Sequence, residues 1–227
     1  ERAERKRMKM NAAVRAKEEI FEAEQTPPPA LPKAKPLYLG LKRLFDIVLA
    51  LLACVLCLIP CGIIALAIRL DSPGQVIFRQ ERLGKDGKPF VMYKFRSMRA
   101  DAEQNGPQWA EKYDTRCTRV GAFLRRSRLD ELPQMINILK GDMSFVGPRP
   151  ERKVFYDLFE TYIPGFYRRL QVKPGLTGLA QVSGGYDLGP EEKIVYDMEY
   201  IRHQSVWMDL RCMLMTVHIV LHHEGAR

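Results

Sequence analysis

The amino-acid sequence predicts a mostly helical α+β protein with a re-entrant membrane helix hairpin and a small domain at the membrane surface. Three observations support this fold class. A nearly continuous apolar run occupies residues 44–68, two strand-like stretches flank a turn sequence at 85–88, and helical periodicity dominates beyond residue 100. A chain of 227 residues can hold one modest domain with appendages.

The composition fits a folded protein with anionic partners. Hydrophobic residues make up 46% of the chain and charged residues 28%, which argues against wholesale disorder. The formal net charge of +9 favours phosphorylated substrates, an acidic bilayer surface or nucleic acid. Since the sequence has no recognised nucleic-acid motif and no basic helix interleaved with aromatics, we expect no nucleic-acid partner.

The cysteines do not form a disulfide pattern. Cys54, Cys57 and Cys61 lie inside the apolar run, and Cys117 and Cys212 are isolated. The C-x2-C-x3-C spacing allows a metal or iron–sulfur site, but no fourth ligand lies nearby. We therefore interpret these thiols as small hydrophobic side chains and expect a reducing, cytoplasmic location for the polar part of the chain.

The N-terminal region predicts two segments that precede the membrane helix. Residues 1–25 are a charged, helix-prone extension, which is either a solvated helix or a basic arm on anionic lipid. Residues 26–41 form a proline-rich linker, because the prolines at 27–29 and 32 break a helix and favour extended chain.

Residues 42–70 predict a membrane helix that bends. The 25 residues from Leu44 to Ile68 would reach roughly 37 Å as a straight helix, enough to span a bilayer. Pro60 removes a backbone hydrogen bond and predicts a sharp break. Basic residues flank both ends, and positive flanks prefer the cytoplasm. A helix that enters, bends at Pro60 and returns therefore fits better than a full span.

Asp46 is the acidic residue near the start of this apolar run. An unpaired carboxylate in lipid is costly, so we expect Asp46 to pair with Arg43 or Lys42 at the membrane interface.

Residues 71–227 predict a polar domain with membrane-associated helices. The stretches 75–80 and 89–95 flank Lys85-Asp86-Gly87-Lys88, which is typical of a β-hairpin. The segment 205–223 is an amphipathic helix that lies either in a core or in the bilayer interface.

The segment 124–150 carries the most chemistry. Apolar residues recur at helical spacing, and Gly141 predicts where the helix stops. Pro133 fits only a first turn, so the helix should begin near Leu129 or Asp130. Asp130 and Glu131 then lie at a helix N-terminus, either as simple capping acids or as reactive carboxylates.

Adjacent carboxylates repel each other and require a nearby positive charge. Arg125 or another of the neighbouring arginines, or a divalent metal, would supply it. Downstream, Pro148 and Pro150 restrict the backbone around Arg149 and present a guanidinium suited to phosphate oxygens. An ionised carboxylate beside such cations suits attack on phosphorus.

Several blocks together resemble one protein family. The stretch LDELPQMINILKGDMSFVGPRP is preceded by KRLFDIVLALLA and YKFRSMRAD and followed by KPGLTGLAQVSG. In this order the blocks are similar to the bacterial sugar transferases, which are monotopic phosphoglycosyl transferases acting on polyprenol phosphate. The resemblance runs from about Lys42 to the C-terminus and implies a re-entrant helix broken at the position of Pro60.

The resemblance also implies a reaction and roles for its residues. The aspartate matching Asp130 attacks the β-phosphate of a UDP-sugar and expels UMP, and polyprenol (undecaprenyl) phosphate then takes the sugar phosphate from the aspartate. The glutamate matching Glu131 helps to bind Mg²⁺. The remaining positions near the phosphates or the substrate match Arg125, Arg149, Lys94, Asp197 and Gln181.

The late motif at residues 178–185 resembles members that transfer a hexose 1-phosphate, glucose or galactose, and such members are often longer than this chain. The family places the enzyme in the bacterial inner membrane, with the catalytic domain on the cytoplasmic face, at the first membrane step of exopolysaccharide, capsule or O-antigen-type assembly. A homodimer is expected from the helix-prone N-terminus. The alternative is a non-catalytic membrane-anchored module that binds lipid phosphate or scaffolds other proteins.

Overall fold

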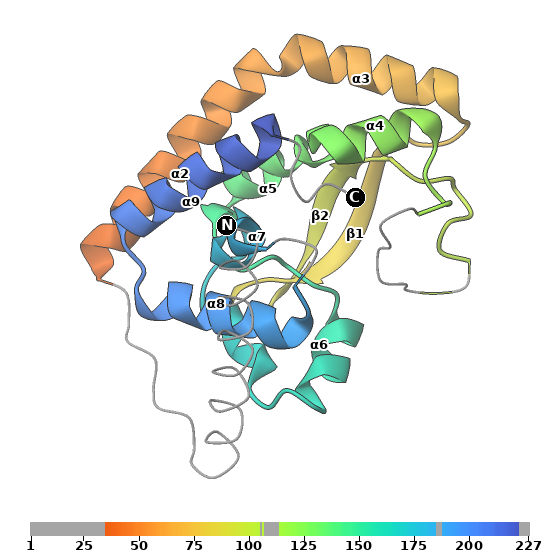
Figure 1. The fold of residues 1–227 in the computed structure, drawn as a ribbon. Helices are drawn as coiled ribbons and strands as arrows, with labels where there is room; N and C mark the ends of the chain where they lie inside the picture. Colours follow the sequence, from red (N-terminus) through yellow and green to blue (C-terminus); the bar gives the residue numbers. More distant parts are fainter. Residues whose placement is uncertain (1–34, 105, 107–113, 185–187, 223–227) are drawn as a thin grey trace.

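A computed structural model describes residues 35–104, 106, 114–184 and 188–222, in which helices surround two small sheets (Figure 1). The predicted extension 1–25 and the linker up to residue 34 lie outside the described residues. The mostly helical α+β fold is confirmed. The helices are α2 (Pro36–Leu56), α3 (Leu58–Asp71), α4 (Arg119–Ser127), α5 (Gln134–Lys140), α6 (Lys153–Glu160), α7 (Leu179–Ser183), α8 (Pro190–Arg202) and α9 (Val206–Leu221).

The first described helix starts earlier than predicted. Residues 36–41, which we assigned to the linker, are helical, and Pro36 occupies the first turn of α2. Proline is suited to that position, because the N–H it lacks would have no partner within the helix. The prolines of this region therefore belong to two features: Pro36 begins α2, and the earlier prolines belong to the predicted linker.

The break in the apolar segment lies at Cys57, between α2 and α3, where the two helices bend by 61°. Pro60 is the third residue of α3, in its first turn, and offers no N–H to the carbonyl of Leu56. The predicted break is therefore present, but it lies at Cys57, about one helical turn before Pro60. The pair forms a wide V rather than a closed hairpin (Figure 1).

Within the described residues, no single helix is both long and apolar enough to cross a bilayer. The α2–α3 pair reaches that length and composition only when its two helices are taken together. The predicted re-entrant insertion therefore stays a prediction.

Asp46 does not pair with Arg43 or Lys42, so that expectation was wrong. Its Oδ1 accepts hydrogen bonds from the Ser144 hydroxyl and the Phe145 N–H, both at 3.0 Å. Lys42 instead contacts a carboxylate of α9, and Arg43 donates to two carbonyls at the end of α5. Asp46 is buried because it pairs with a strand of the domain and not with its own helix.

The predicted β-hairpin is confirmed. Strand β1 (Ile77–Leu83) pairs antiparallel with β2 (Pro89–Phe95), from Ile77 opposite Phe95 to Leu83 opposite Pro89. A short parallel pair, β3 (Ser144–Val146) with β4 (Gly175–Thr177), brings two distant segments together.

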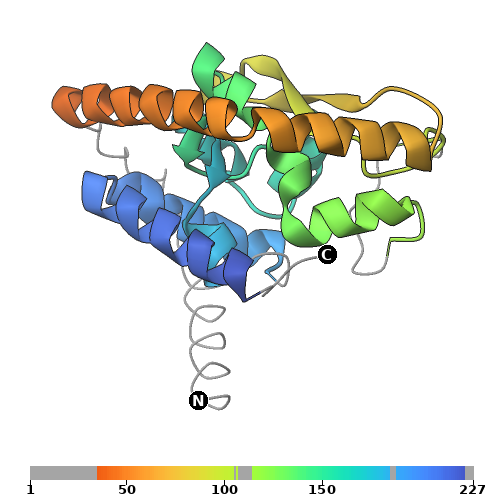
Figure 2. The ribbon, with the colours of Figure 1, turned by 90° about the horizontal axis from the view of Figure 1, so that it is seen from above.

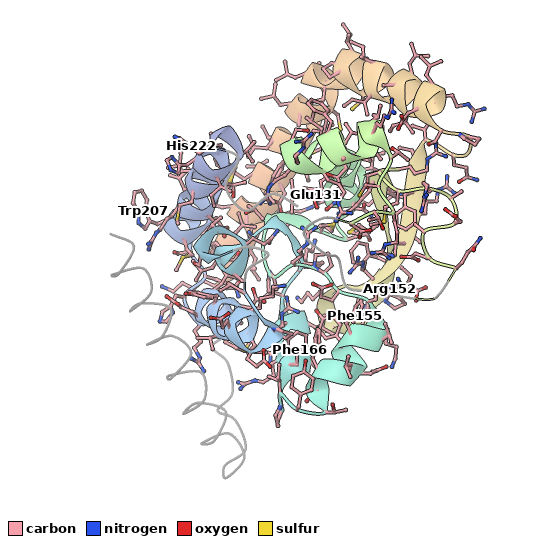
Figure 3. All side chains as sticks on the ribbon, turned by 45° about the vertical axis from the view of Figure 1, so that its right-hand side comes forward. Glu131, Arg152, Phe155, Phe166, Trp207 and His222 are labelled. Atoms are coloured by element: carbon pink, nitrogen blue, oxygen red, sulfur yellow. The ribbon has the colours of Figure 1, made fainter. Side chains whose placement is uncertain are left out.

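The helices divide the molecule into two ends. Helix α4 lies beside α3, α9 contacts the beginning of α2 through Asp209, and α6 and α8 lie at the opposite end of the molecule from α3 (Figures 1 and 2). The predicted C-terminal helix is confirmed as α9, capped by the Ser205 hydroxyl, which accepts from the Met208 N–H. Large apolar side chains remain exposed on α2, α3 and α9, and Trp207 points away from the body (Figure 3).

Candidate active site

Asp130 and Glu131 lie on a tight turn between two helices. After α4, Arg128 adopts a left-handed conformation with φ of 58°, and residues 129–131 form a single 3-10 turn. Helix α5 begins at Gln134, five residues after Leu129 and four after Asp130, the two predicted starts. Gly141, with φ of 90°, ends it as predicted. The turn aims both carboxylates inward, where they are 7% and 8% exposed.

Two cations from distant segments hold Glu131. Lys94 of β2 donates to Glu131 Oε1 at 2.8 Å, and Arg149 Nη2 donates to the same oxygen at 2.5 Å. Lys94 Nζ also lies 3.9 Å from Asp130 Oδ2. The structure thus brings together four of the residues proposed from sequence, and the cations offset the repulsion between the adjacent acids.

The pKa values of the two carboxyl groups are shifted in opposite directions. Burial raises the pKa of Asp130, and the charge of Lys94 opposes the rise. Burial also disfavours ionisation of Glu131, but the charges of Arg149 and Lys94 outweigh it and lower the pKa of this group. Glu131 is therefore a fixed anion, whereas Asp130 is a desolvated carboxylate without a hydrogen-bonded cation of its own.

Glycines place Arg149 at this site. The loop after β3 is clamped by backbone hydrogen bonds from Gly147 N–H to the Thr177 carbonyl and from Gly175 N–H to the Pro148 carbonyl, both at 2.9 Å. A Cβ at Gly175 would overlap the backbone of Gly147. Gly147 of the GPRP motif and Gly175 of the KPGLTG motif therefore pack backbone against backbone, and only glycine allows this close approach.

A cavity of about 470 Å³ opens in front of Asp130 and Glu131. Eleven of its lining residues are Lys or Arg, whereas four are Asp or Glu. Figure 3 shows Glu131 in the interior of the molecule, and Arg152 and Phe155 on the side of α6. Such an excess of cations around two carboxylates suits a ligand with more than one phosphate.

Arg125 and Gln181, both expected at the site, line this cavity. Arg125 Nη1 contacts the Cys117 sulfur at 3.1 Å and lies 3.8 Å from Asp114 Oδ2, so its charge reaches Asp130 only at longer range. Gln181 donates to the Leu176 carbonyl, and its Oε1 is buried without a donor among the described residues.

Asp197 does not line the cavity. Its Oδ2 accepts from Arg169 Nε at 2.6 Å, in a pair that is almost fully buried. Burial raises the pKa of Asp197, and Arg169 opposes the rise. Arg169, which Asp197 holds, lines the cavity, and a direct substrate contact of Asp197 stays a prediction.

Sequence reasoning missed Arg169, Lys193, Glu151 and Arg152. Glu151 and Arg152 directly follow the Pro-Arg-Pro motif, and that adjacency was a usable signal. Arg169 follows another arginine in a helical stretch, and nothing in the local pattern distinguishes the buried one from Arg168.

The acidic pair offers a limited metal site. Among the described residues, no group of three or more His, Cys, Asp or Glu side chains could hold a metal ion. Mg²⁺ is commonly held by only one or two carboxylates together with substrate phosphates, so Asp130 and Glu131 fit a magnesium that arrives with a phosphorylated ligand.

The chain is similar to known proteins over most of its length. The bacterial sugar transferase family profile matches residues 37–223. A UDP-N-acetylgalactosamine-undecaprenyl-phosphate N-acetylgalactosaminephosphotransferase of Aeromonas hydrophila is 44% identical over 195 residues, 85% of this chain and 46% of that protein. A UDP-glucose:undecaprenyl-phosphate glucose-1-phosphate transferase of Escherichia coli K12 is 47% identical over 182 residues, 78% of this chain and 39% of that protein. The chain thus spans about half the length of these relatives, or less, and it belongs to the bacterial sugar transferase family.

Proposed function

We propose that this protein transfers a sugar 1-phosphate from a UDP-sugar to undecaprenyl phosphate, giving an undecaprenyl diphosphate sugar and UMP. The names of its relatives support the reaction class. The observation that carries the proposal is a buried Asp130 that faces a cation-rich cavity beside a Glu131 already paired with Lys94 and Arg149.

The proposed first step is attack by Asp130 on the sugar-bearing phosphorus. A bond forms between a carboxylate oxygen and phosphorus, and the bond to the nucleoside phosphate breaks, so that UMP departs with the electron pair. Burial removes water from Asp130, and Lys94 Nζ lies 3.9 Å from its Oδ2, too far for a hydrogen bond, so the oxygen lone pairs stay available. Attack of the lipid phosphate on the aspartyl phosphosugar then regenerates the carboxylate.

The other residues position and neutralise the phosphates. Arg149 and Lys94 supply the charge that balances the phosphate oxygens as the bond to UMP breaks. Glu131, held by both cations, would bind Mg²⁺ together with Asp130 and the diphosphate. That ion would add Lewis-acid neutralisation of the departing nucleotide.

The donor sugar is proposed as a hexose, glucose or galactose, on the motif at residues 178–185. Relatives at 44% and 47% identity are named for N-acetylgalactosamine and for glucose, so overall identity does not choose between them. The sugar has to be assigned by experiment.

The proposed location is the cytoplasmic face of the bacterial inner membrane. The exposed apolar residues of α2, α3 and α9, including Trp207, would lie in the lipid, and the α2–α3 pair would enter and return. The opposite end, with α6 and α8, would face the cytoplasm (Figure 1).

Intact-mass measurement on the purified protein tests the proposal. The protein is mixed with each of a panel of UDP-sugars and Mg²⁺ without lipid acceptor, and a sugar-phosphate adduct is expected on the wild type and not on Asp130→Asn. The mass increase identifies the sugar. An absence of adduct, together with no UMP release when undecaprenyl phosphate is added, would favour the non-catalytic lipid-binding module.

A further inference from the structure

Four basic side chains of the cavity form two groups that meet at Arg149. The first consists of Lys94 and Arg149, which contact Glu131. The second contains Arg169, whose Nη2 donates to the Arg149 carbonyl at 3.1 Å, and Lys193 of α8. A ligand phosphate bound by the first group therefore has a second cationic site beside it.

Arg169 is a rigid, buried cation in the cavity wall. It is 2% exposed, and its Nε is fixed by Asp197. Its guanidinium carbon lies 4.7 Å from the Phe166 ring centroid and 5.7 Å from that of Tyr156. Nη1 has no hydrogen-bond acceptor within the described part of the chain. A buried donor without an acceptor is costly, and an anion in the cavity would relieve that cost.

Lys193 is a second basic residue of the same cavity wall. It lies one helical turn before Asp197 on α8 and lines the same cavity. Burial lowers the pKa of the Lys193 ammonium, Arg169 and Arg149 lower it further, and Glu151 and Asp197 oppose them. A bound phosphate would stabilise Arg149, Arg169 and Lys193 together, because its negative charge offsets the repulsion among the three cations.

We propose that Arg169 and Lys193 bind two phosphates in turn, that of the nucleotide as it leaves and that of the lipid as it attacks. This inference rests on the proposed two-step reaction. In each in-line displacement at the sugar-bearing phosphorus, Asp130 occupies one apical position. UMP leaves from the opposite apex in the first step, and the lipid phosphate oxygen must attack at that same apex in the second, when the bond to Asp130 breaks. One cationic site therefore serves both half-reactions.

Titration with UMP tests the phosphate site directly. Calorimetry compares the wild type with Lys193→Met, the rescue variant Lys193→Arg and the matched control Lys88→Met, which removes an exposed lysine of the hairpin turn. Loss of one charge-assisted contact should weaken UMP binding about 10- to 100-fold in Lys193→Met, with recovery in Lys193→Arg and no change in Lys88→Met. Equal UMP affinity in wild type and Lys193→Met overturns the proposal.

Separate half-reactions test whether the site is shared. Lys193→Met should slow adduct formation from UDP-sugar by at least about 10-fold, and also the transfer from preformed adduct to undecaprenyl phosphate. UMP should compete with undecaprenyl phosphate in the wild type. A defect confined to adduct formation, or inhibition that undecaprenyl phosphate does not relieve, overturns the shared site. A wild type that forms no adduct refutes the proposed function instead, and the UMP titration still reports on the phosphate site.

Discussion

Two adjacent acids at one turn, Asp130 and Glu131, have different contacts and opposite pKa shifts. Glu131 is bound by Lys94 and Arg149, whereas Asp130 is buried with Lys94 no closer than 3.9 Å. Sequence alone placed both acids beside cations, but it could not say which cation faces which acid. That assignment depends on the β1–β2 hairpin, which places Lys94, and on the close backbone approach of Gly147 and Gly175, which places Arg149. Both are tertiary features.

The raised pKa of Asp130 predicts how adduct formation depends on pH. As the proposed nucleophile, Asp130 must be ionised, so the rate should fall as pH drops through a pKa above the ordinary aspartate value of 3.8. Lys94→Met removes the charge that opposes this rise and should shift the acid limb to higher pH. Single-turnover rates measured across pH test this, and an unshifted limb in Lys94→Met would contradict it.

Arg149 should contribute strongly to the rate. Arg149→Ala removes a cation that holds Glu131 and is expected to reduce adduct formation by about 2–5 kcal/mol of barrier, the usual range for a buried charge pair. Arg79→Ala, on an exposed strand position outside the cavity, is the control. A loss below about tenfold in Arg149→Ala would make this arginine structural.

At the scale of elements, local patterns predicted the hairpin, the stop at Gly141 and the C-terminal helix. Local patterns were less accurate where tertiary contacts determine the partner of a side chain. Asp46 was expected to pair with its own helix, but it reaches across to β3, because the polar groups of Ser144 and Phe145 are buried beside it. No spacing rule within residues 42–70 could indicate a partner about a hundred residues away.

Asp46→Ala should destabilise the fold. It leaves the Ser144 hydroxyl and the Phe145 N–H buried without an acceptor, at a cost of about 1–3 kcal/mol each. Thermal unfolding in detergent measures the effect, with Asp157→Ala, which removes an exposed carboxylate, as control. An unchanged unfolding temperature would show that Asp46 does not stabilise this contact.

At the scale of the whole molecule, the membrane placement of α2 and α3 is still to be tested. Both basic flanks and the 61° bend favour return to the same side. Single cysteines introduced at residues 40 and 72, in a background without native thiols, should be labelled from the same face of sealed vesicles. Labelling from opposite faces would establish a full span. Chemical cross-linking of the same vesicles would test the expected homodimer.

The α2–α3 pair is also part of the interior of the domain. Ala50 of α2 packs with residues of β2 and α5, and Ile64 and Ile68 of α3 pack with Phe95 and Leu124 beneath the turn that carries Asp130. Removing the chain before residue 71 would therefore not release a water-soluble enzyme, since it would take members out of both hydrophobic clusters and remove Asp46, the buried partner of β3. The two helices are therefore not an exchangeable tag: their exposed apolar side chains can vary in evolution, but the inner face that packs on the domain must stay fixed.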